Sequence, residues 1–149
     1  MLEQVQKRRS IRQYQKEPIG QEILERILNT GLSVPSSRGR QPWEFLVVQE
    51  EYTLQALGKC RHPQQSFLPQ AAAAIVVFAD PSKSDVWVED SSIAMILMQM
   101  EAEENGLGSC WVQVRRRMAQ GEQETSDAYV KRVLHIPNSY EVLAILSLG

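Results

Sequence analysis

Four short apolar runs, separated by segments with helical spacing, most constrain how this chain can fold. They cover residues 45–48, 75–78, 109–114 and 142–148, and each is bounded by polar or turn-forming residues. Runs of this length and bounding predict strands buried in a sheet. Strands and helices mix without the strict alternation that successive parallel βαβ units require. We therefore expect an α+β fold, in which one sheet is sandwiched by helices.

Two segments between these runs show strong helical spacing. Over 21–32 the recurring apolar residues are Ile23, Leu24, Ile27, Leu28 and Leu32. The second segment ends at Asn105-Gly106, and Asp90 or Ser91 is expected to cap the start of its helix. Glu89 and Asp90 would also place favourable negative charge near that start. Its predicted apolar face is Ile93, Ile96, Leu97 and Met100, widened by Ala94 and Met98. A stripe this wide predicts a central, well-buried helix, which Asn105-Gly106 should end.

Shorter helices are expected over 2–9, 51–60 and 127–134, and loops over 36–43, 61–70 and 115–125. The 149 residues suit a single domain, 1–149. A chain of this length has few residues from which to build both a hydrophobic core and a deep pocket. A site formed by two subunits would reduce the number of residues that each chain must supply. No apolar run approaches the roughly 20 residues of a membrane span.

The charge pattern favours small anions as ligands. The net charge of −2 gives no general attraction to nucleic acid or to a membrane surface. Basic residues are nevertheless clustered at 8–12, 38–40 and 115–117. Cys60 and Cys110 lack metal-binding or redox spacing and are expected to be reduced thiols of a cytoplasmic protein. We assign Cys110 to the core.

The N-terminal cluster has the composition of a phosphate site. Arg8, Arg9, Ser10 and Arg12 lie within five positions, and Arg supplies a planar fork of donors to which Ser adds a short one. The alternative is a solvated basic face. A second polar segment, Pro-Ser-Ser-Arg-Gly-Arg-Gln-Pro-Trp over 35–43, precedes the first strand and could bring backbone close to a planar ligand.

A third segment, Gly106-Leu107-Gly108, superficially resembles a dinucleotide fingerprint. That motif requires a strand before it and a helix after it, whereas here the order is reversed. The segment is better explained as a helix stop followed by a tight turn. His62 and His135 are isolated and predict no metal site. Arg115–Arg117 could meet the extra phosphate of NADPH, although a solvated run is the simpler interpretation.

Taken in order, these segments resemble the nitroreductase family. The resemblance rests on the arginine segment, the Pro-Ser-Ser to Pro-Trp loop, the helix followed by Gly-Leu-Gly-Ser-Cys-Trp, and the closing strand that ends at Gly149. It implies a nitroreductase-like fold with a central, mainly antiparallel sheet of four or five strands flanked by helices. Family members usually continue beyond the last strand with a tail that brings a basic residue to the cofactor phosphate.

The resemblance implies a homodimer with FMN at the subunit interface. The expected FMN-binding residues are Arg8, Arg9, Ser10, Arg12, Pro35, Ser36, Ser37, Arg38, Gln41, Trp111, Val112 and Gln113. The loop over 35–41 would act in part from the partner subunit. A backbone donor from Gln113 or Val114 would face flavin N5, and Arg12 would neutralise charge on the reduced ring.

The implied activity is FMN-dependent NAD(P)H oxidoreduction. NADH or NADPH would pass hydride to flavin N5 and leave, and a nitroaromatic, quinone or similar small acceptor would then take its place in a ping-pong cycle. No side-chain acid or base is needed, so no catalytic residue is assigned. One alternative is an FMN-binding carrier or redox-sensing flavoprotein without a dedicated substrate. Another is a dimeric α+β module that no longer holds flavin.

Overall fold

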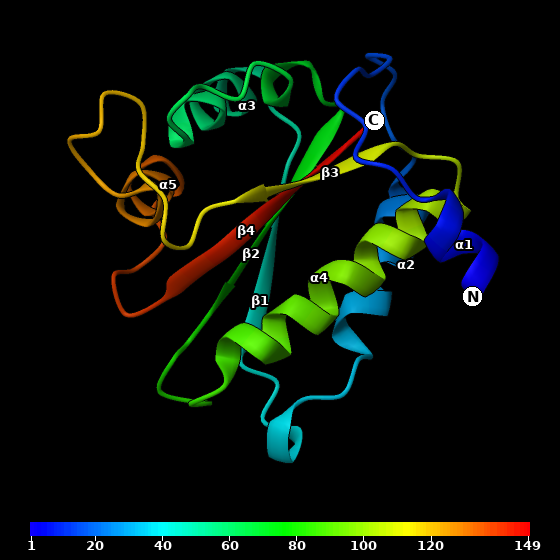
Figure 1. The fold of residues 1–149 in the computed structure, drawn as a ribbon, viewed down its shortest axis with the longest axis horizontal. Helices are drawn as coiled ribbons and strands as arrows, with labels where there is room; N and C mark the ends of the chain where they lie inside the picture. Colours follow the sequence, from blue (N-terminus) through cyan, green and yellow to red (C-terminus); the bar gives the residue numbers. More distant parts are fainter.

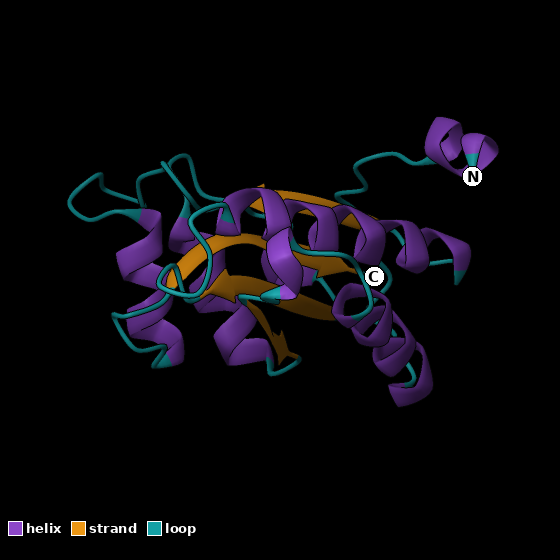
Figure 2. Ribbon diagram, turned by 90° about the horizontal axis from the view of Figure 1, so that it is seen from below, coloured by secondary structure: helices purple, strands orange, loops and turns teal.

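The computed structural model describes all residues, 1–149, and contains one four-stranded sheet covered by helices on both faces (Figures 1 and 2). The strands are β1 (Trp43–Val48), β2 (Ala73–Ala79), β3 (Ser109–Gln113) and β4 (Glu141–Leu148). Their order is β1-β2-β4-β3 and every pairing is antiparallel, so the expected α+β class and mainly antiparallel sheet are confirmed. β2 and β4 lie in the middle, which explains their almost continuous apolar sequences.

The chain contains five α-helices. They are α1 (Leu2–Lys7), α2 (Gln21–Leu32), α3 (Glu51–Leu57), α4 (Trp87–Glu104) and α5 (Ser126–Leu134). Short 3-10 turns occur at η1 (Ser37–Gly39), η2 (Gly58–Cys60) and η3 (Leu68–Gln70). All five predicted helical segments are therefore helical, with small shifts at their ends. None of these helices has the length and apolar character needed to cross a membrane.

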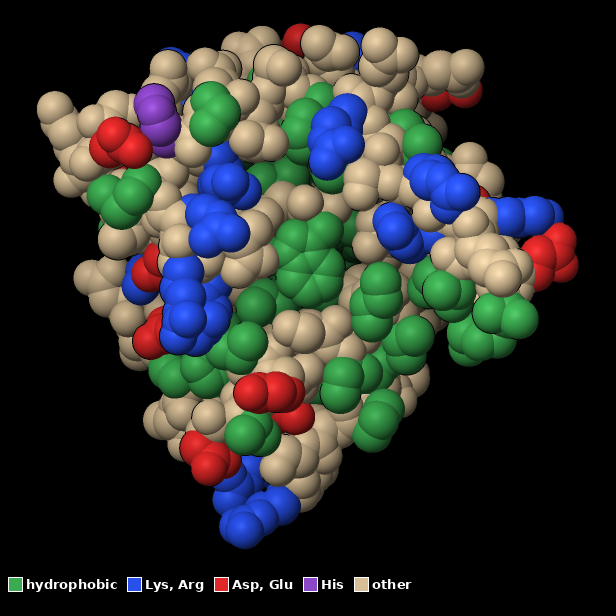
Figure 3. All heavy atoms as spheres, in the orientation of Figure 1, with side chains coloured by type: hydrophobic (Ala, Val, Ile, Leu, Met, Phe, Trp, Pro, Cys, Tyr) green, Lys and Arg blue, Asp and Glu red, His purple; other side chains and the backbone are tan.

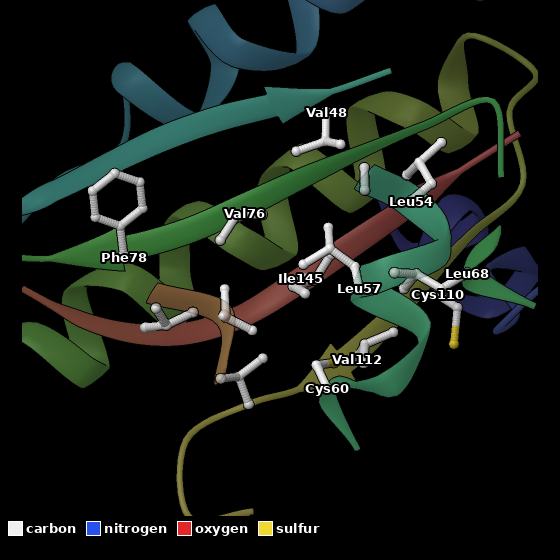
Figure 4. Packing of buried hydrophobic residues seen from close by; sticks show 14 of the residues in the cluster. Val48, Leu54, Leu57, Cys60, Leu68, Val76, Phe78, Cys110, Val112 and Ile145 are labelled. Atoms are coloured by element: carbon white, nitrogen blue, oxygen red, sulfur yellow. The ribbon is translucent and has the colours of Figure 1, made fainter. Parts of the chain in front are cut away.

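The two faces of the sheet bury separate clusters of apolar side chains. One face packs against α3 and α5, where Val76 and Ile145 meet Leu54 and Leu57 (Figure 4). The other face packs against α2 and α4, through residues such as Met95. Alternate strand residues point to opposite faces, so each central strand contributes to both clusters. Cys110 is buried on the α3 and α5 side, as the sequence predicted.

The predicted buried face of α4 is correct for Ala94 and Met98 but wrong for Ile93 and Ile96. Ile93 and Ile96 are exposed, while Ala94, Met95 and Met98 are completely buried against the sheet. The helix is apolar on nearly all sides, so spacing alone could not identify the face that packs on the sheet. The helix also begins at Trp87, earlier than predicted, and therefore includes Glu89 and Asp90 in its first turn.

The N-terminal helix α1 stands apart from this core. Figure 2 shows it projecting from the main body on an extended segment, and none of its residues is buried. Leu2 and Val5 are nevertheless apolar and exposed. A six-residue helix has little stability of its own, and the contacts of α1 with α4 leave Leu2 and Val5 uncovered.

Candidate functional site

The arginine segment lies against the beginning of β3. The Ile11 N–H donates to the Ser109 carbonyl over 2.8 Å, and Ser10 and Ser109 form a short parallel bridge. This approach depends on Gly108, because a Cβ at that position would lie only 2.8 Å from the Ile11 side chain. Gly108, which belongs to the segment that superficially resembles a dinucleotide fingerprint, therefore allows the arginine segment to pack closely against β3.

Tyr14 fixes the other end of the arginine segment to the sheet. Its hydroxyl donates to the Ile11 carbonyl over 2.5 Å and lies 2.7 Å from Ser147 Oγ, which in turn donates to the Cys110 carbonyl over 3.2 Å. Burial raises the pKa of Tyr14 to about 12. Sequence reasoning did not assign these residues to the site. The only signal was an aromatic residue two positions after Arg12.

Arg8, Ser10 and Arg12 converge around the Cys110 thiol at this edge. Burial raises the pKa of Cys110, and the nearby Arg12, Ser10 and Arg8 side chains oppose that rise. The Arg12 guanidinium also lies 5.8 Å from the centre of the Phe67 ring, a cation–π contact that orients it. Three of the four residues predicted to hold a phosphate are thus brought together.

Arg9 is directed elsewhere. Its Nη1 donates to the carbonyls of Gln6 and Arg8, over 2.6 and 2.9 Å, at the end of α1. These contacts satisfy carbonyls that a helix end leaves unpaired. In this conformation Arg9 stabilises α1, and its guanidinium has fewer donors free for a ligand than those of Arg8 and Arg12.

The outer edge of β3 presents unpaired backbone groups. Successive residues of an edge strand direct their N–H and C=O groups alternately toward the sheet and away from it. Because the Ser109 carbonyl accepts from outside the sheet, Trp111 and Gln113 also face outward. The Val114 N–H instead donates to the Leu143 carbonyl within the sheet. Of the two backbone donors that the sequence analysis named, Gln113 and Val114, only the N–H of Gln113 therefore faces outward.

The side chains of β3 divide between the two faces. Val112 is buried in the core beneath α3 and α5. Trp111 and Gln113 are half-buried on the other face, where Trp111 Nε1 donates to Gln113 Oε1 over 2.8 Å. The Gln113 amide donates onward to the Arg115 carbonyl over 3.0 Å. The two side chains therefore form a fixed, partly apolar surface beside the open edge.

The loop over 35–41 is held by α4. The Ser37 N–H donates to buried Asp90 over 2.8 Å, and Asp90 also accepts from Ser84 Oγ over 2.8 Å. Within the loop, the Gln41 N–H donates to Ser36 Oγ over 2.9 Å. Positive φ angles occur at Arg38 (54°), Gly39 (64°) and Gln41 (47°). Pro35, Arg38 and Gln41 are exposed at its surface. Asp90 thus positions the loop, a role that sequence reasoning reduced to helix-end charge.

The arginine segment and this loop lie near opposite ends of α4. The loop contacts Asp90 in the first turn of α4, whereas the arginine segment contacts β3, which follows the last turn (Figure 1). At a rise of 1.5 Å per residue, the helix between Asp90 and Glu104 alone spans about 21 Å. One chain therefore does not assemble all the predicted site residues.

The surface around β3 is strongly basic over an apolar floor. Figure 3 shows Lys and Arg side chains on both sides of a hollow with hydrophobic side chains between them. No carboxylate lies within 4.0 Å of the guanidinium groups of Arg8, Arg12 or Arg61. Unpaired guanidinium groups beside outward backbone N–H groups fit an anionic, planar ligand.

The family model described as the nitroreductase family matches residues 5–62 and 49–149, and so covers nearly the whole chain. The chain belongs to the nitroreductase family. The family resemblance of the sequence and the expected nitroreductase-like fold are thereby confirmed.

Three relatives illustrate the range of similarity within the family. A provisionally named NADH dehydrogenase/NAD(P)H nitroreductase of Archaeoglobus fulgidus is 37% identical over 99% of this chain and 83% of its own length. The structure of an FMN-dependent nitroreductase from Clostridium difficile R20291 superimposes with a TM-score of 0.96 at 44% identity, covering 100% of this chain and 86% of that one. A provisionally named nitroreductase from Desulfovibrio desulfuricans, solved in complex with FMN, shares the fold with a TM-score of 0.82 at 22% identity, over 99% and 84% of the two chains.

Proposed function

We propose that this chain is an FMN-dependent oxidoreductase that accepts electrons from NADH or NADPH and reduces small oxidised acceptors such as nitroaromatics or quinones. The names of the similar Clostridium difficile and Archaeoglobus fulgidus proteins support both the cofactor and the electron donor. Bound FMN would supply the two-electron chemistry, and donor and acceptor would occupy the same face in turn. Cys60 and Cys110 are both free thiols, which favours a reducing compartment such as the cytoplasm.

The chain's own residues have separable roles in this proposal. Arg8, Ser10 and Arg12 would hold the phosphate and balance negative charge near the reduced ring, because their donors are unpaired by carboxylates. The outward N–H of Gln113 would donate to the ring edge. The half-buried Trp111 and Gln113 side chains would shield one side of the site from water.

The observation that carries the proposal is the separation of the two ligand-binding segments along α4. A second copy related by a two-fold axis, with its α4 antiparallel to the first, would place the loop of one copy beside the arginine segment of the other. The exposed apolar residues of α4 favour this arrangement, since Ile93 and Ile96 are 40% exposed and lack a partner in the single chain. Exposed α1 would gain its missing packing surface in the same dimer.

The first experiment is the absorption spectrum of the purified protein. A flavin spectrum that bleaches with NADH or NADPH and recovers on adding a quinone supports the oxidoreductase. Flavin that binds but is not bleached by either nucleotide would instead favour the carrier or sensor. Lack of flavin binding, even after FMN is added, would contradict the proposal.

A subunit-mixing experiment tests the shared site directly. Arg12→Ala damages the arginine segment, whereas Asp90→Ala releases the loop, and each should lower FMN binding when present in both copies. If the two variants are unfolded and refolded together, half of the dimers are mixed, and each mixed dimer contains one undamaged site. About a quarter of all sites should then bind FMN normally. No recovery above the average of the separate variants would show that each site belongs to one chain.

A further inference from the structure

Arg61 is an anchored guanidinium that the proposed cofactor contacts do not use. It follows η2, and its Nη1 donates to the Gln113 carbonyl at the outer edge of β3 over 3.1 Å. Its Nε is buried without a hydrogen-bond partner. No carboxylate lies within 4.0 Å of the group. The buried Nε is closed to a ligand, whereas Nη2 is neither buried nor hydrogen-bonded and is free to donate to one.

The side chain of Gln113 is engaged with its own neighbours and makes no hydrogen bond to Arg61. The Gln113 amide oxygen already accepts from Trp111, and its nitrogen already donates to the Arg115 carbonyl. This chain of contacts fixes the surface against which Arg61 lies. The contact to the Gln113 backbone restricts the guanidinium before any ligand arrives, which lowers the entropic cost of binding one.

Arg61 also lies too far from the phosphate cluster to serve the same anion. Arg8, Ser10 and Arg12 gather near the start of β3, while Arg61 binds its last residue. The distance from Ser109 to Gln113 along the strand is about 13 Å at the usual rise per residue. Two separate basic positions thus lie along one strand.

We propose that Arg61 binds an anionic group of the small molecule that reacts at this site. The inference rests on the proposed function, since it places this group beside the outward N–H of Gln113. The guanidinium fork suits the paired oxygens of a carboxylate or a phosphate. These could belong to the acceptor, as in an aromatic acid, or to the phosphates of the nicotinamide nucleotide.

The test compares charged and neutral ligands of the same shape. FMN-loaded wild-type protein and Arg61→Gln are titrated with benzoate and with benzamide, and binding is followed by the change in flavin absorption. Wild type should prefer benzoate by about tenfold, a modest value for a charge-assisted bond at a partly exposed site. Arg61→Gln should abolish the preference and leave benzamide binding within about twofold. Arg116→Gln is the matched control, because it removes an exposed charge nearby and should retain most of the preference.

The second arm identifies the source of the anion. Binding of NAD⁺ and NADP⁺ is measured in the same way for each variant. Loss of benzoate preference with unchanged nucleotide binding assigns Arg61 to an acidic acceptor. A tenfold loss of nucleotide affinity with unchanged benzoate binding assigns it to a nucleotide phosphate. Unchanged affinity for all of these anions would overturn the proposal.

A purely structural role for Arg61 predicts a different pattern. Arg61→Gln would then lower the melting temperature and weaken benzoate and benzamide equally, and that result would also overturn the anion site. Arg61→Lys keeps the charge and should retain part of the benzoate preference. If wild-type protein binds no FMN, the proposed function fails. Benzoate, benzamide and NADP⁺ are then compared by calorimetry on the flavin-free wild-type and Arg61→Gln proteins, and affinities for both anions that do not depend on Arg61 would reject the anion site independently.

Discussion

Replacing Ile96 with Glu tests the proposed subunit interface most directly. Ile93 and Ile96 lie on the side of α4 that faces away from the sheet, and each is 40% exposed. Full burial of such a side chain contributes about 1.5–3 kcal/mol, so the exposed two-fifths is worth about 0.6–1.2 kcal/mol for each. A two-fold dimer would bury four such side chains, for a total of about 2–5 kcal/mol.

Ile96→Glu removes part of this gain and adds a larger penalty. A two-fold interface carries the substitution twice, and each buried carboxylate costs several kcal/mol when no cation is opposite. A combined loss of about 4–6 kcal/mol weakens association by a factor of about 10³–10⁴. Light scattering at low micromolar concentration should therefore give the 16.9 kDa chain mass for the variant and twice that mass for wild type. Flavin fluorescence should report release of FMN at the same concentrations.

The matched control is Tyr52→Glu. Tyr52 is 78% exposed on α3, on the opposite face of the sheet, so this charge change should affect neither mass nor FMN retention. Circular dichroism checks that Ile96→Glu remains folded, as expected because the side chain contributes little to the core. The reasoning would be refuted by a variant that stays dimeric, or by a monomer that still holds FMN.

Three further predictions follow from individual contacts. Arg8→Ala should weaken FMN binding about tenfold or more by equilibrium titration, whereas Arg9→Ala should weaken it less than about threefold, because Arg9 is engaged at the end of α1. Asp90→Ala should lower the free energy of unfolding by about 2–3 kcal/mol in urea titrations, because it leaves the Ser37 N–H without an acceptor. Asp90→Asn keeps a side-chain oxygen there and should lower the free energy of unfolding by less. Burial raises the pKa of Tyr14 to about 12, so stability that is fully present below pH 10 should be lost as the pH rises from 10 through 12. Tyr14→Phe, unfolded in parallel, should show a flatter decline across that range, and equal declines would contradict this assignment.

The sheet was accessible from sequence because its strands are short apolar runs with clear boundaries. Three of the four predicted runs lie wholly within observed strands, the run 109–114 extends one residue past β3, and Gly106 has the positive φ of 77° expected after the end of α4. The packing side of α4 was not accessible in this way. Ala94 and Met98 pack on the sheet because they are small or flexible enough for close helix–sheet contact, whereas branched Ile93 and Ile96 lie outside.

The arrangement of the site was only partly predictable. The family resemblance assigned the arginine segment and the 35–41 loop to one FMN site shared by two subunits, but the sequence did not show that an 18-residue helix separates them within the chain. The role of Asp90 depends on a backbone donor 53 positions away, which no local pattern reveals. Arg61 was missed for the same reason, because its partner Gln113 is distant in sequence and is contacted through the main chain.

The exposed edge of β3 also bears on how copies of the protein avoid unwanted association. An unpaired strand edge is a template for another strand, and such contacts lead to aggregation. Here the Ile11 N–H caps the Ser109 carbonyl at one end and the Arg61 guanidinium caps the Gln113 carbonyl at the other. The open stretch between them is too short for a second strand to form a continuous ladder, but it still admits the rim of a flat ring. In the ligand-free protein, the contacts of Ile11 and Arg61 therefore block the edge of β3 against another strand and leave it open to a small ligand.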